Sequence, residues 1–433
     1  MWSLPASYLA SLRVILRGRQ VAFLTVNVVA NMITLVRSYV TMQALDHRSL
    51  GIITVMQTLT MLVSLAHLGL LNGGYRLLCS ADDAQARRIN DTAYGFFIVL
   101  TIVTMAAGGV AGNGFAEIAT WVVLMGIGAG LLMLVRNWMN NQMIAEQRLD
   151  LLNRVTIWSA ILSLLPLVAV RSAPLEACIL SISIQPAIFI LVVLTKAPSL
   201  RPRRLSFDVS LLRTIFGTGF LIFLSGMMLQ LSGQMERWYV TRYLGLEALG
   251  HLYLALLAVN LFAVVPNALQ WLHLPRIIQG WDTGEGAVIT ERMRLLFLSN
   301  AGYCLATLMA VLLLVRPVIE RWLPAYTGDL LYVYLILPGL ILYTLFSAPA
   351  VIFSVLIRYR LYYAAFGAGT LATGLAFAAT PLFGVRLGLV EVMVLKSATY
   401  TLTGAILLAG FWALSRKFPA FRFGLASSAA REE

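Results

Sequence analysis

The sequence predicts an all-α polytopic membrane protein with about twelve transmembrane helices. Sixty per cent of the 433 residues are hydrophobic and only 12% are charged, which is about half the charged fraction of a soluble domain. The apolar stretches run to about 20 residues, the length that a helix needs to cross a hydrocarbon core of about 30 Å. They lack period-2 alternation and are rich in Leu, Ala, Met and Gly, so helices are favoured over a β-barrel.

Twelve apolar stretches are expected to be the spans. In chain order they are residues 21–42, 51–72, 94–112, 117–135, 155–171, 176–195, 214–233, 249–272, 295–315, 330–354, 361–382 and 388–413. Pro338 and Pro349 interrupt the tenth stretch and are expected to kink it. The first span is expected to be retained, because no Ala-x-Ala cleavage site follows it. Residues 4–16 are expected to form an amphipathic segment on the membrane surface.

The distribution of Lys and Arg gives the orientation. With the N-terminus placed in the cytoplasm, the cytoplasmic segments hold 23 of the 32 Lys and Arg residues and the outer segments hold seven. This bias follows the positive-inside rule and predicts a multi-pass inner-membrane protein with both termini in the cytoplasm. It also accounts for the net charge of +13. Because no basic cluster is interleaved with stacking aromatic residues, no nucleic-acid partner is expected.

A repeat with an offset of about 200 residues divides the chain into halves. The matching segments are Arg37-Ser-Tyr-Val-Thr41 with Arg237-Trp-Tyr-Val-Thr241, Leu50-Gly51 with Leu249-Gly250, and Arg76 with Arg276. We therefore expect an N-terminal six-helix bundle over residues 1–195 and a C-terminal bundle with a short cytoplasmic tail over residues 214–433. The polar stretch 196–213 is expected to be a cytoplasmic linker between them.

The even number of spans in each half constrains the symmetry. Both halves must enter the membrane in the same orientation, so a pseudo-two-fold axis along the membrane normal is expected to relate them. Equivalent residues then lie at equal depth and can face a central cavity. This geometry suits alternating access.

Polar residues inside the first span are the first candidates for that cavity. Asn27, Asn31 and Thr34 share one helix face, and polar residues at helical spacing should face protein or water. The alternative for these amides is interhelical hydrogen bonding. Arg37 lies about 24 Å along the span, nearer the outer face than the midplane. It is either a snorkelling arginine at the interface or a fixed cation in the upper cavity.

The second half offers further candidates. Gln230 and Gln234 form a polar pair on span seven, and Arg237, the repeat partner of Arg37, is expected to be more solvated than Arg37 because Glu236 is adjacent. Lys396 lies about eight residues into span twelve, so it either lines the cavity or pairs with a distant acid or carbonyl.

Other charged residues lie near the ends of the spans. Glu391 lies near the outer boundary and is a candidate for ion coupling. Arg76, Arg276 and Arg358 lie at the cytoplasmic mouth. Most such residues are topology anchors, and the functional alternative is that they receive an anionic head group.

Enzyme chemistry is not expected. The four His residues have no metal-ligand spacing, and Walker A and Gly-x-Ser-x-Gly motifs are missing from the sequence. The three Cys residues give no readable disulfide framework. No cofactor or metal is therefore expected.

Three segments resemble a known family. They are Leu50-Gly51, Leu68-Gly-Leu-Leu-Asn-Gly-Gly-Tyr-Arg76 and the second-half segment Tyr243-Leu-Gly-Leu-Glu-Ala-Leu-Gly-His-Leu-Tyr253. With the order of the twelve spans, they resemble the Wzx-type polysaccharide flippases of the multidrug/oligosaccharidyl-lipid/polysaccharide exporter (MOP) superfamily. Order and spacing over nearly the whole chain carry the resemblance, rather than any single motif.

The resemblance implies a function. Such a flippase moves an undecaprenyl-pyrophosphate-linked oligosaccharide to the periplasmic leaflet for O-antigen or exopolysaccharide synthesis, through a cationic cavity between two bundles. A positive cavity would compensate the pyrophosphate charge away from bulk water. The implied partners are the lipid-linked oligosaccharide, membrane lipids, a polysaccharide polymerase and a chain-length regulator.

Two alternatives remain. One is a cation- or proton-coupled small-molecule (drug) antiporter. Drug exporters of the superfamily commonly carry a carboxylate in span one, whereas this chain has no acid between residues 21 and 42. The other is a membrane glycosyltransferase or polysaccharide polymerase, which the short outer loops disfavour.

Overall fold

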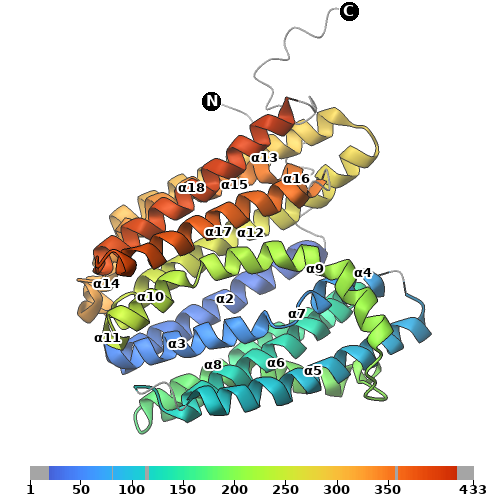
Figure 1. Ribbon diagram of the computed structural model, residues 1–433, viewed down its shortest axis with the longest axis horizontal. Coiled ribbons are helices and arrows are strands. Elements are labelled where there is room, and N and C mark those ends of the chain that lie inside the picture. The colour runs from blue at the N-terminus through green and yellow to red at the C-terminus, as the bar shows by residue number, and fades with distance from the viewer. Residues whose placement is uncertain (1–18, 80, 113–116, 356–358, 417–433) are drawn as a thin grey trace, which may run out of the picture. The chain divides into compact units, whose positions relative to one another are not determined.

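The computed structural model describes residues 19–79, 81–112, 117–355 and 359–416, and every regular element in these ranges is helical (Figure 1). The predicted amphipathic segment 4–16 and Arg358 lie outside these ranges. The chain divides into two compact units, residues 1–224 and 225–433. The predicted boundaries at residues 195 and 214, and the predicted central cavity, stay predictions.

The N-terminal unit contains the helices of the first six predicted spans. They are α2 (Arg19–Ala44), α3 (His47–Ser64), α4 (Leu70–Leu78), α5 (Asp83–Gly112), α6 (Thr120–Ala145), α7 (Leu149–Leu162), which continues as the 3₁₀ turn Leu165–Ala169, and α8 (Pro174–Lys196). A second 3₁₀ turn, Pro198–Leu200, begins the linker. Helices α3 and α6 lie side by side, and α6 also packs on α5 and α8.

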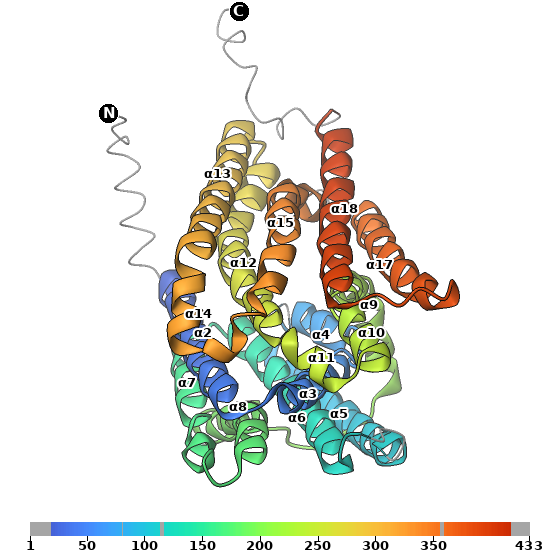
Figure 2. The ribbon, with the colours of Figure 1, turned by 90° about the vertical axis from the view of Figure 1, so that its left-hand side faces the viewer.

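Helix α9 (Val209–Ser232) passes from the first unit into the second. The remaining helices are α10 (Met235–Tyr243), α11 (Leu246–His251), α12 (Tyr253–Asp282), α13 (Gly286–Ala310) with the π-helical turn Val311–Val315, α14 (Arg316–Trp322), the 3₁₀ turn Pro324–Tyr326, α15 (Leu330–Ser347) with the 3₁₀ turn Ala348–Ala350, α16 (Val351–Val355), α17 (Tyr359–Leu382) and α18 (Leu389–Ser415). Helices α15 and α18 pack along their length, and α12 packs on α13 and α15 (Figure 2).

These helices account for the twelve predicted spans. By length and hydropathy, eight stretches of the described residues can cross a membrane, and nine if Val209–Leu224 and Gly226–Tyr243 form one bent span. The other three predicted spans coincide with α2, with α3 and α4 together, and with α17. The predicted all-helical class with about twelve spans is confirmed.

The second span differs from its prediction because it is broken. Helix α3 ends at Ser64 and α4 begins at Leu70, and both Leu68 and Gly69 between them have positive φ angles. The Nδ1 atom of His67 accepts a hydrogen bond from the N–H of Gly69 at 3.1 Å, which stabilises the break locally. In the tenth span, α15 continues through Pro338 and ends at Ser347, and the 3₁₀ turn Ala348–Ala350 that follows contains Pro349.

The linker is hydrogen-bonded to the N-terminal part of α5. The Asn90 amide donates to the carbonyl of Leu200 at 3.1 Å, and the N–H of Arg203 donates to the Asp91 carboxylate at 2.9 Å. The Arg88 guanidinium pairs with Asp208 at 2.5 Å. These bonds hold the linker against α5 of the N-terminal unit.

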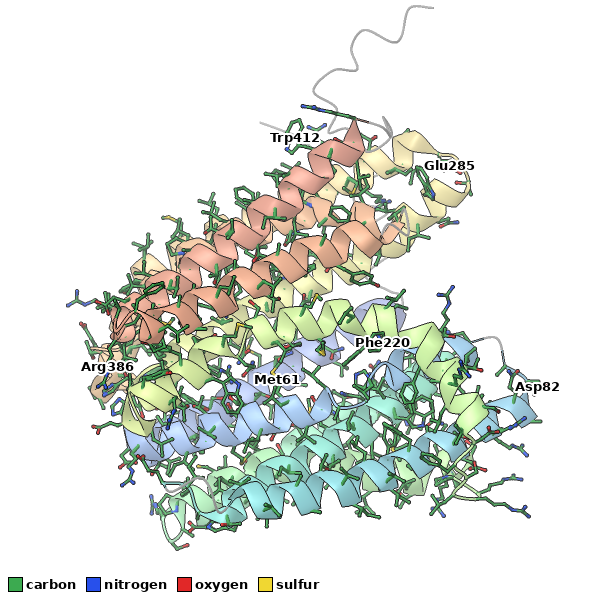
Figure 3. The ribbon with its side chains drawn as sticks, in the orientation of Figure 1. Met61, Asp82, Phe220, Glu285, Arg386 and Trp412 are labelled. Carbon is green, nitrogen blue, oxygen red and sulfur yellow. The ribbon has the colours of Figure 1, made fainter. Side chains whose placement is uncertain are left out.

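The loops of the C-terminal unit lie at two opposite ends of its helices. Figure 3 shows Arg386, in the loop between α17 and α18, at one end of this unit, and Glu285 and Trp412 at the other. The sequence assigns residue 386 to the outer side and residue 285 to the cytoplasmic side. The core of this unit contains Phe353 and Phe411, which are 1% and 2% exposed.

Candidate functional site

Arg37 reaches from α2 to the middle of α8. Its Nη1 atom donates to the carbonyl of Ser181 at 3.2 Å and to the side-chain oxygen of Gln185 at 3.0 Å. Gln185 is the twelfth of the 23 residues of α8. Side chains on a helix lean toward its N-terminus, which directs this guanidinium toward the N-terminal half of α2. These bonds hold the guanidinium of Arg37 against α8.

A second guanidinium, from Arg136 of α6, contacts α8 one helical turn beyond Gln185. The Arg136 Cζ atom lies over the Phe189 ring, 5.2 Å from its centroid, and residues 185 and 189 share a face of α8. Arg136 also lies within electrostatic range of Arg37, which has the same charge. Among the described residues, Arg136 makes no hydrogen bond and no ion pair. Its charge is therefore held mainly by one aromatic face.

Helix α6 continues beyond the expected end of the fourth span. The fourth span was expected to end at residue 135, which put Arg136 in a cytoplasmic segment. Instead α6 continues to Ala145, because the polar residues after Arg136 have partners inside the protein. The Trp138 indole and the Gln142 amide both donate to the Asn90 side-chain oxygen, at 2.9 and 2.7 Å.

The helices around these two arginines carry little negative charge. Helices α2 and α6 contain no Asp or Glu, and α8 contains only Glu176, in its first turn. An uncompensated cation is costly in an apolar region. We define Arg37, Arg136 and Gln185 as the arginine site, and its charge is suited to an anion.

Asn27 and Asn31, which were predicted to line the cavity, lie nearer the N-terminus of α2 than Arg37 does. The Asn31 amide donates to the backbone carbonyl of Asn27 at 2.8 Å, and the hydroxyl of Thr34 donates to the carbonyl of Ala30 at 3.0 Å. Both bonds lie within α2, and all three polar side chains are half-buried. These hydrogen bonds do not join Asn27 or Asn31 to the arginine site.

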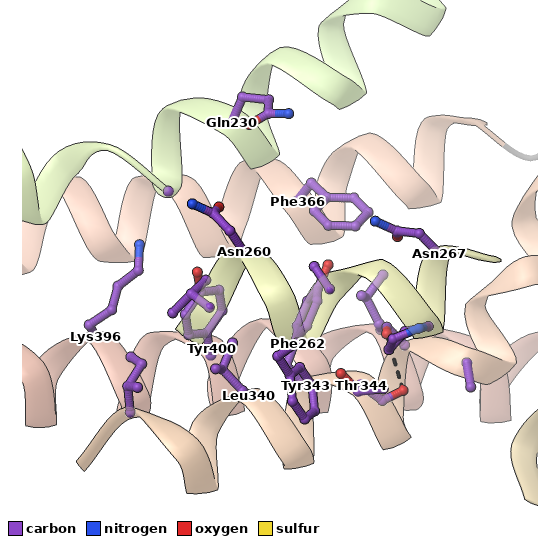
Figure 4. A pocket seen from close by; sticks show the side chains of 18 of the residues that line it. Gln230, Asn260, Phe262, Asn267, Leu340, Tyr343, Thr344, Phe366, Lys396 and Tyr400 are labelled. Carbon is purple, nitrogen blue, oxygen red and sulfur yellow. Dashed lines mark hydrogen bonds between the residues drawn. The ribbon is translucent and has the colours of Figure 1, made fainter. Parts of the chain in front are cut away.

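The C-terminal unit contains a cavity of about 490 Å³, which we call the amide pocket. Its polar lining consists mainly of amides, including Gln230, Asn260, Asn267 and Gln270, and its apolar lining includes Phe262, Phe366, Tyr343 and Tyr400. Figure 4 shows Asn260 and Asn267 of α12 extending into the pocket, with Gln230 and Phe366 across from them. Three predicted cavity residues, Gln230, Arg237 and Lys396, line it.

Of the alternatives that its sequence position left open, the structure shows Lys396 paired with a distant acid and a carbonyl. It lines the amide pocket, and its Nζ atom donates to the Glu236 carboxylate at 2.9 Å and to the Ser232 carbonyl at 2.5 Å. The ammonium also lies 4.9 Å from the centroid of the Tyr400 ring. Lys396 and Glu236 are each 2% exposed, so this is a buried ion pair.

Arg237 corrects another expectation. The sequence suggested a more solvated position than that of Arg37, but Arg237 is only 9% exposed, whereas Arg37 is half-buried. The reason is that Glu236 faces the protein and binds Lys396 instead of continuing into a solvated loop. Helix α10 carries both residues within the C-terminal unit.

Glu391, Arg76 and Arg276 are exposed. Glu391 lies in the first turn of α18, and among the described residues it forms no ion pair. Arg76 lies in the last turn of α4 and Arg276 lies on α12. Neither the ion-coupling role of Glu391 nor the head-group role of the arginines is tested by these positions.

Local structure supports the internal repeat. The Thr41 hydroxyl donates to the carbonyl of Arg37 at 2.9 Å, and the Thr241 hydroxyl donates to the carbonyl of Arg237 at 2.7 Å. Leu50 and Leu249, which follow at matching positions, are both fully buried. The two segments therefore share side-chain bonding and burial as well as sequence.

Sequence reasoning missed several groups that the structure brings to these sites. Gln185 and Arg136 complete the arginine site, and Asn260 and Asn267 dominate the amide pocket. The two asparagines are seven residues apart, with Gln270 three residues further on. That spacing puts the three amides on one helix face. Amides that share one face of an apolar span are a sequence signal for a polar cavity on that side of the helix.

Comparisons with known proteins establish the fold. A multidrug resistance MATE family transporter of the MOP superfamily, solved in an inward-facing conformation, matches with a TM-score of 0.68 at 14% identity over 93% of this chain and 96% of that chain. An outward-facing structure of such a transporter matches with a TM-score of 0.65 at 12% identity, over 93% and 97%. A MATE structure in the bent conformation matches with a TM-score of 0.60 at 12% identity, over 93% and 96%. No family model matches the sequence, and no curated protein matches it.

Proposed function

We propose that the protein is a flippase that moves undecaprenyl-pyrophosphate-linked oligosaccharide repeat units from the cytoplasmic to the periplasmic leaflet of a bacterial inner membrane. The observation that carries the proposal is the arginine site. Arg136 has no anionic partner among the described residues, and the helices that carry Arg37 and Arg136 contain no acid. A pyrophosphate has the charge and the several acceptor oxygens that guanidinium groups bind best.

The fold supports the mechanism. Similar solved structures include inward-facing and outward-facing transporters, so alternating access is the proposed mode of transport. Binding of the pyrophosphate would offset the cost of holding two like charges close together. The polar head group then crosses the bilayer beside protein groups, while the lipid tail remains in hydrocarbon. No step requires bond chemistry, so the proposal is a transporter and not an enzyme.

A deletion experiment tests the proposed function. In a glycan-producing host without this gene, lipid-linked repeat units are expected to accumulate on the cytoplasmic side, and expression of the wild-type chain should restore surface glycan. The variant Arg37→Gln should restore far less surface glycan at an equal protein level. Normal surface glycan in the deletion strain, with redundant flippases also deleted, would contradict the proposal.

A small-molecule antiporter is the second candidate. The observations in its favour are the described multidrug resistance of the similar structures and the buried carboxylate of Glu236, since a buried acid is a means of coupling transport to protons or cations. The pairing of Glu236 with Lys396 counts against it, because the acid is already neutralised. Export of cationic dyes by the wild-type chain, with normal surface glycan in the deletion strain, would favour this candidate.

A further inference from the structure

We propose that the amide pocket of the C-terminal unit binds an uncharged sugar residue. This inference rests on the proposed function for the identity of the larger substrate, the lipid-linked oligosaccharide. The pocket itself supplies the chemistry: amides that both donate and accept hydrogen bonds, beside aromatic faces.

The accessible polar groups of the pocket are neutral. Gln230, Asn260 and Asn267 are exposed, whereas the charged lining residues Glu236, Arg237 and Lys396 are buried. Lys396 and Glu236 hold each other at 2.9 Å. A ligand that enters the pocket therefore meets uncharged amides first, which favours a neutral polar group over an ion.

These amides are not used by the protein itself. Among the described residues, the side chains of Gln230, Asn260 and Asn267 make no hydrogen bond. Each primary amide offers two donors and one acceptor oxygen. In a membrane-spanning helix, such groups must face water or a ligand, because hydrocarbon cannot satisfy them. Sugar hydroxyls are suitable partners, since each of them also donates and accepts.

Aromatic rings complete the match. Tyr343 and Tyr400 lie with their ring centroids 5.6 Å apart and line the pocket with Phe262 and Phe366. The negative face of an aromatic ring attracts weakly positive C–H groups, and a pyranose ring presents such C–H groups on its faces. A volume of about 490 Å³ falls within the range of about 300–1,000 Å³ typical of small-molecule sites.

The pocket wall is held in place by tertiary bonds. Pro266 of α12 has no N–H, which leaves the carbonyl of Phe262 without its helical donor. The hydroxyl of Tyr303 donates to that carbonyl at 3.1 Å. The bond joins α12 to α13 at the level of the asparagines, so that their positions are fixed before a ligand binds.

Saturation-transfer difference NMR on the purified full-length protein in detergent micelles tests the proposal. The probes are the methyl glycosides of glucose, galactose and N-acetylglucosamine, with methyl glucuronide as a charged comparison. At least one neutral glycoside should receive saturation from the wild-type protein. The variants Asn260→Ala and Asn267→Ala should each weaken that binding about 3- to 10-fold, as expected for one lost hydrogen bond.

Gln279→Ala is the matched control, because Gln279 is an exposed amide of α12 that does not line the pocket. All variants must give a monodisperse protein with the wild-type melting temperature. The proposal is overturned if no neutral glycoside binds, if only the glucuronide binds, or if both pocket variants bind as the wild type does.

Binding of sugar-free undecaprenyl pyrophosphate to the same preparations separates the two proposals. If a neutral glycoside binds but undecaprenyl pyrophosphate does not, the sugar pocket stands and the flippase proposal fails. If undecaprenyl pyrophosphate binds but no neutral glycoside does, the reverse holds.

Discussion

Charged side chains inside the apolar spans are stabilised in two different ways. Lys396 has an acid, a carbonyl and an aromatic ring around it, so its charge is compensated within the protein. Arg136 has the Phe189 ring and a neighbour of like charge. The first arrangement compensates the charge within the protein, and the second is the basis of the proposed anion site.

Replacing Arg136 tests its role in transport. The variant Arg136→Gln should lower surface-glycan export about 10- to 100-fold, because one charge-assisted hydrogen bond to the substrate is lost. The measurement is surface glycan in a complemented deletion strain, normalised to protein level. Arg154→Gln, at an exposed position of α7, should export like the wild type. Equal export by both variants would assign Arg136 to packing.

Replacing Lys396 tests the buried pair. Lys396→Met should destabilise the protein by about 3–5 kcal/mol, since it leaves the Glu236 carboxylate buried without its cation. Adding Glu236→Gln should recover most of the loss. Thermal unfolding in detergent measures both effects. Arg316→Met, which breaks the exposed Arg316–Glu320 pair, should cost at most about 1 kcal/mol; a cost similar to that of Lys396→Met would refute the distinction.

Some site residues could be predicted from the sequence and others could not. Arg37 and Lys396 were identifiable because they are charged residues within apolar stretches. Their distance from the ends of the predicted spans was enough to mark them as candidate site residues. Arg136 was missed because a run of polar residues follows it, and those residues find partners on α5 only after the chain folds. The Glu236 partner of Lys396 was also hidden, because 160 residues separate the two.

At the level of elements, one helix crossing depends on glycines. A Cβ added at Gly73 of α4 would overlap the carbonyl oxygen of Ile215, and one at Gly219 of α9 would overlap the backbone at Gly69 and Gly73. Small residues let helix backbones approach this closely in membranes. The left-handed break at Leu68 and Gly69 lies beside this crossing. Because the break accompanies a contact between helices and not a local drop in hydropathy, the sequence alone predicted one continuous span there.

The crossing can be tested with a single methyl group. Gly73→Ala should destabilise the protein by about 1–3 kcal/mol, because the Cβ forces two backbones apart. Gly217→Ala is the control, since a Cβ at that position of α9 meets no atom within 4 Å. Thermal unfolding in detergent compares the two variants. Equal melting temperatures would show that α4 and α9 do not approach so closely.

The linker provides a test that depends on pH. Asp208 caps α9 by accepting from the N–H of Leu211 at 3.0 Å and from the Ser210 hydroxyl at 2.7 Å. With the Arg88 pair, these hydrogen bonds hold the pKa of the Asp208 carboxyl well below its usual value. A lowered folded-state pKa means that the stabilisation is present above the unfolded pKa of about 3.9 and is lost as pH falls through the lowered value.

Hydrogen exchange measures this capping. Amides of residues 203–212 should stay protected at neutral pH and lose protection, after correction for intrinsic rates, as pH falls below about 4. Asp208→Asn should reduce protection already at neutral pH. The same protection in wild type and variant at neutral pH would show that the carboxylate does not fix the linker.

At the scale of the whole molecule, charge bias and the repeat predict the topology. Alkaline phosphatase, which is active only outside the cytoplasm, should be inactive when fused after Leu200 in the linker. It should be active when fused after Ala325, between α14 and α15. A fusion at Arg416 should be inactive. An active fusion in the linker would reverse the proposed orientation, and with it the direction of transport.

Movement of a lipid-linked oligosaccharide across a bilayer of proteoliposomes is the most direct measurement of the central claim. Purified wild-type protein should make the oligosaccharide accessible to a glycosidase on the opposite side, at a rate well above that of protein-free vesicles. The variants Arg37→Gln and Arg136→Gln, reconstituted in equal amounts, should each lower that rate at least about tenfold. No movement by the wild type, or equal movement by the wild type and both variants, would contradict the account.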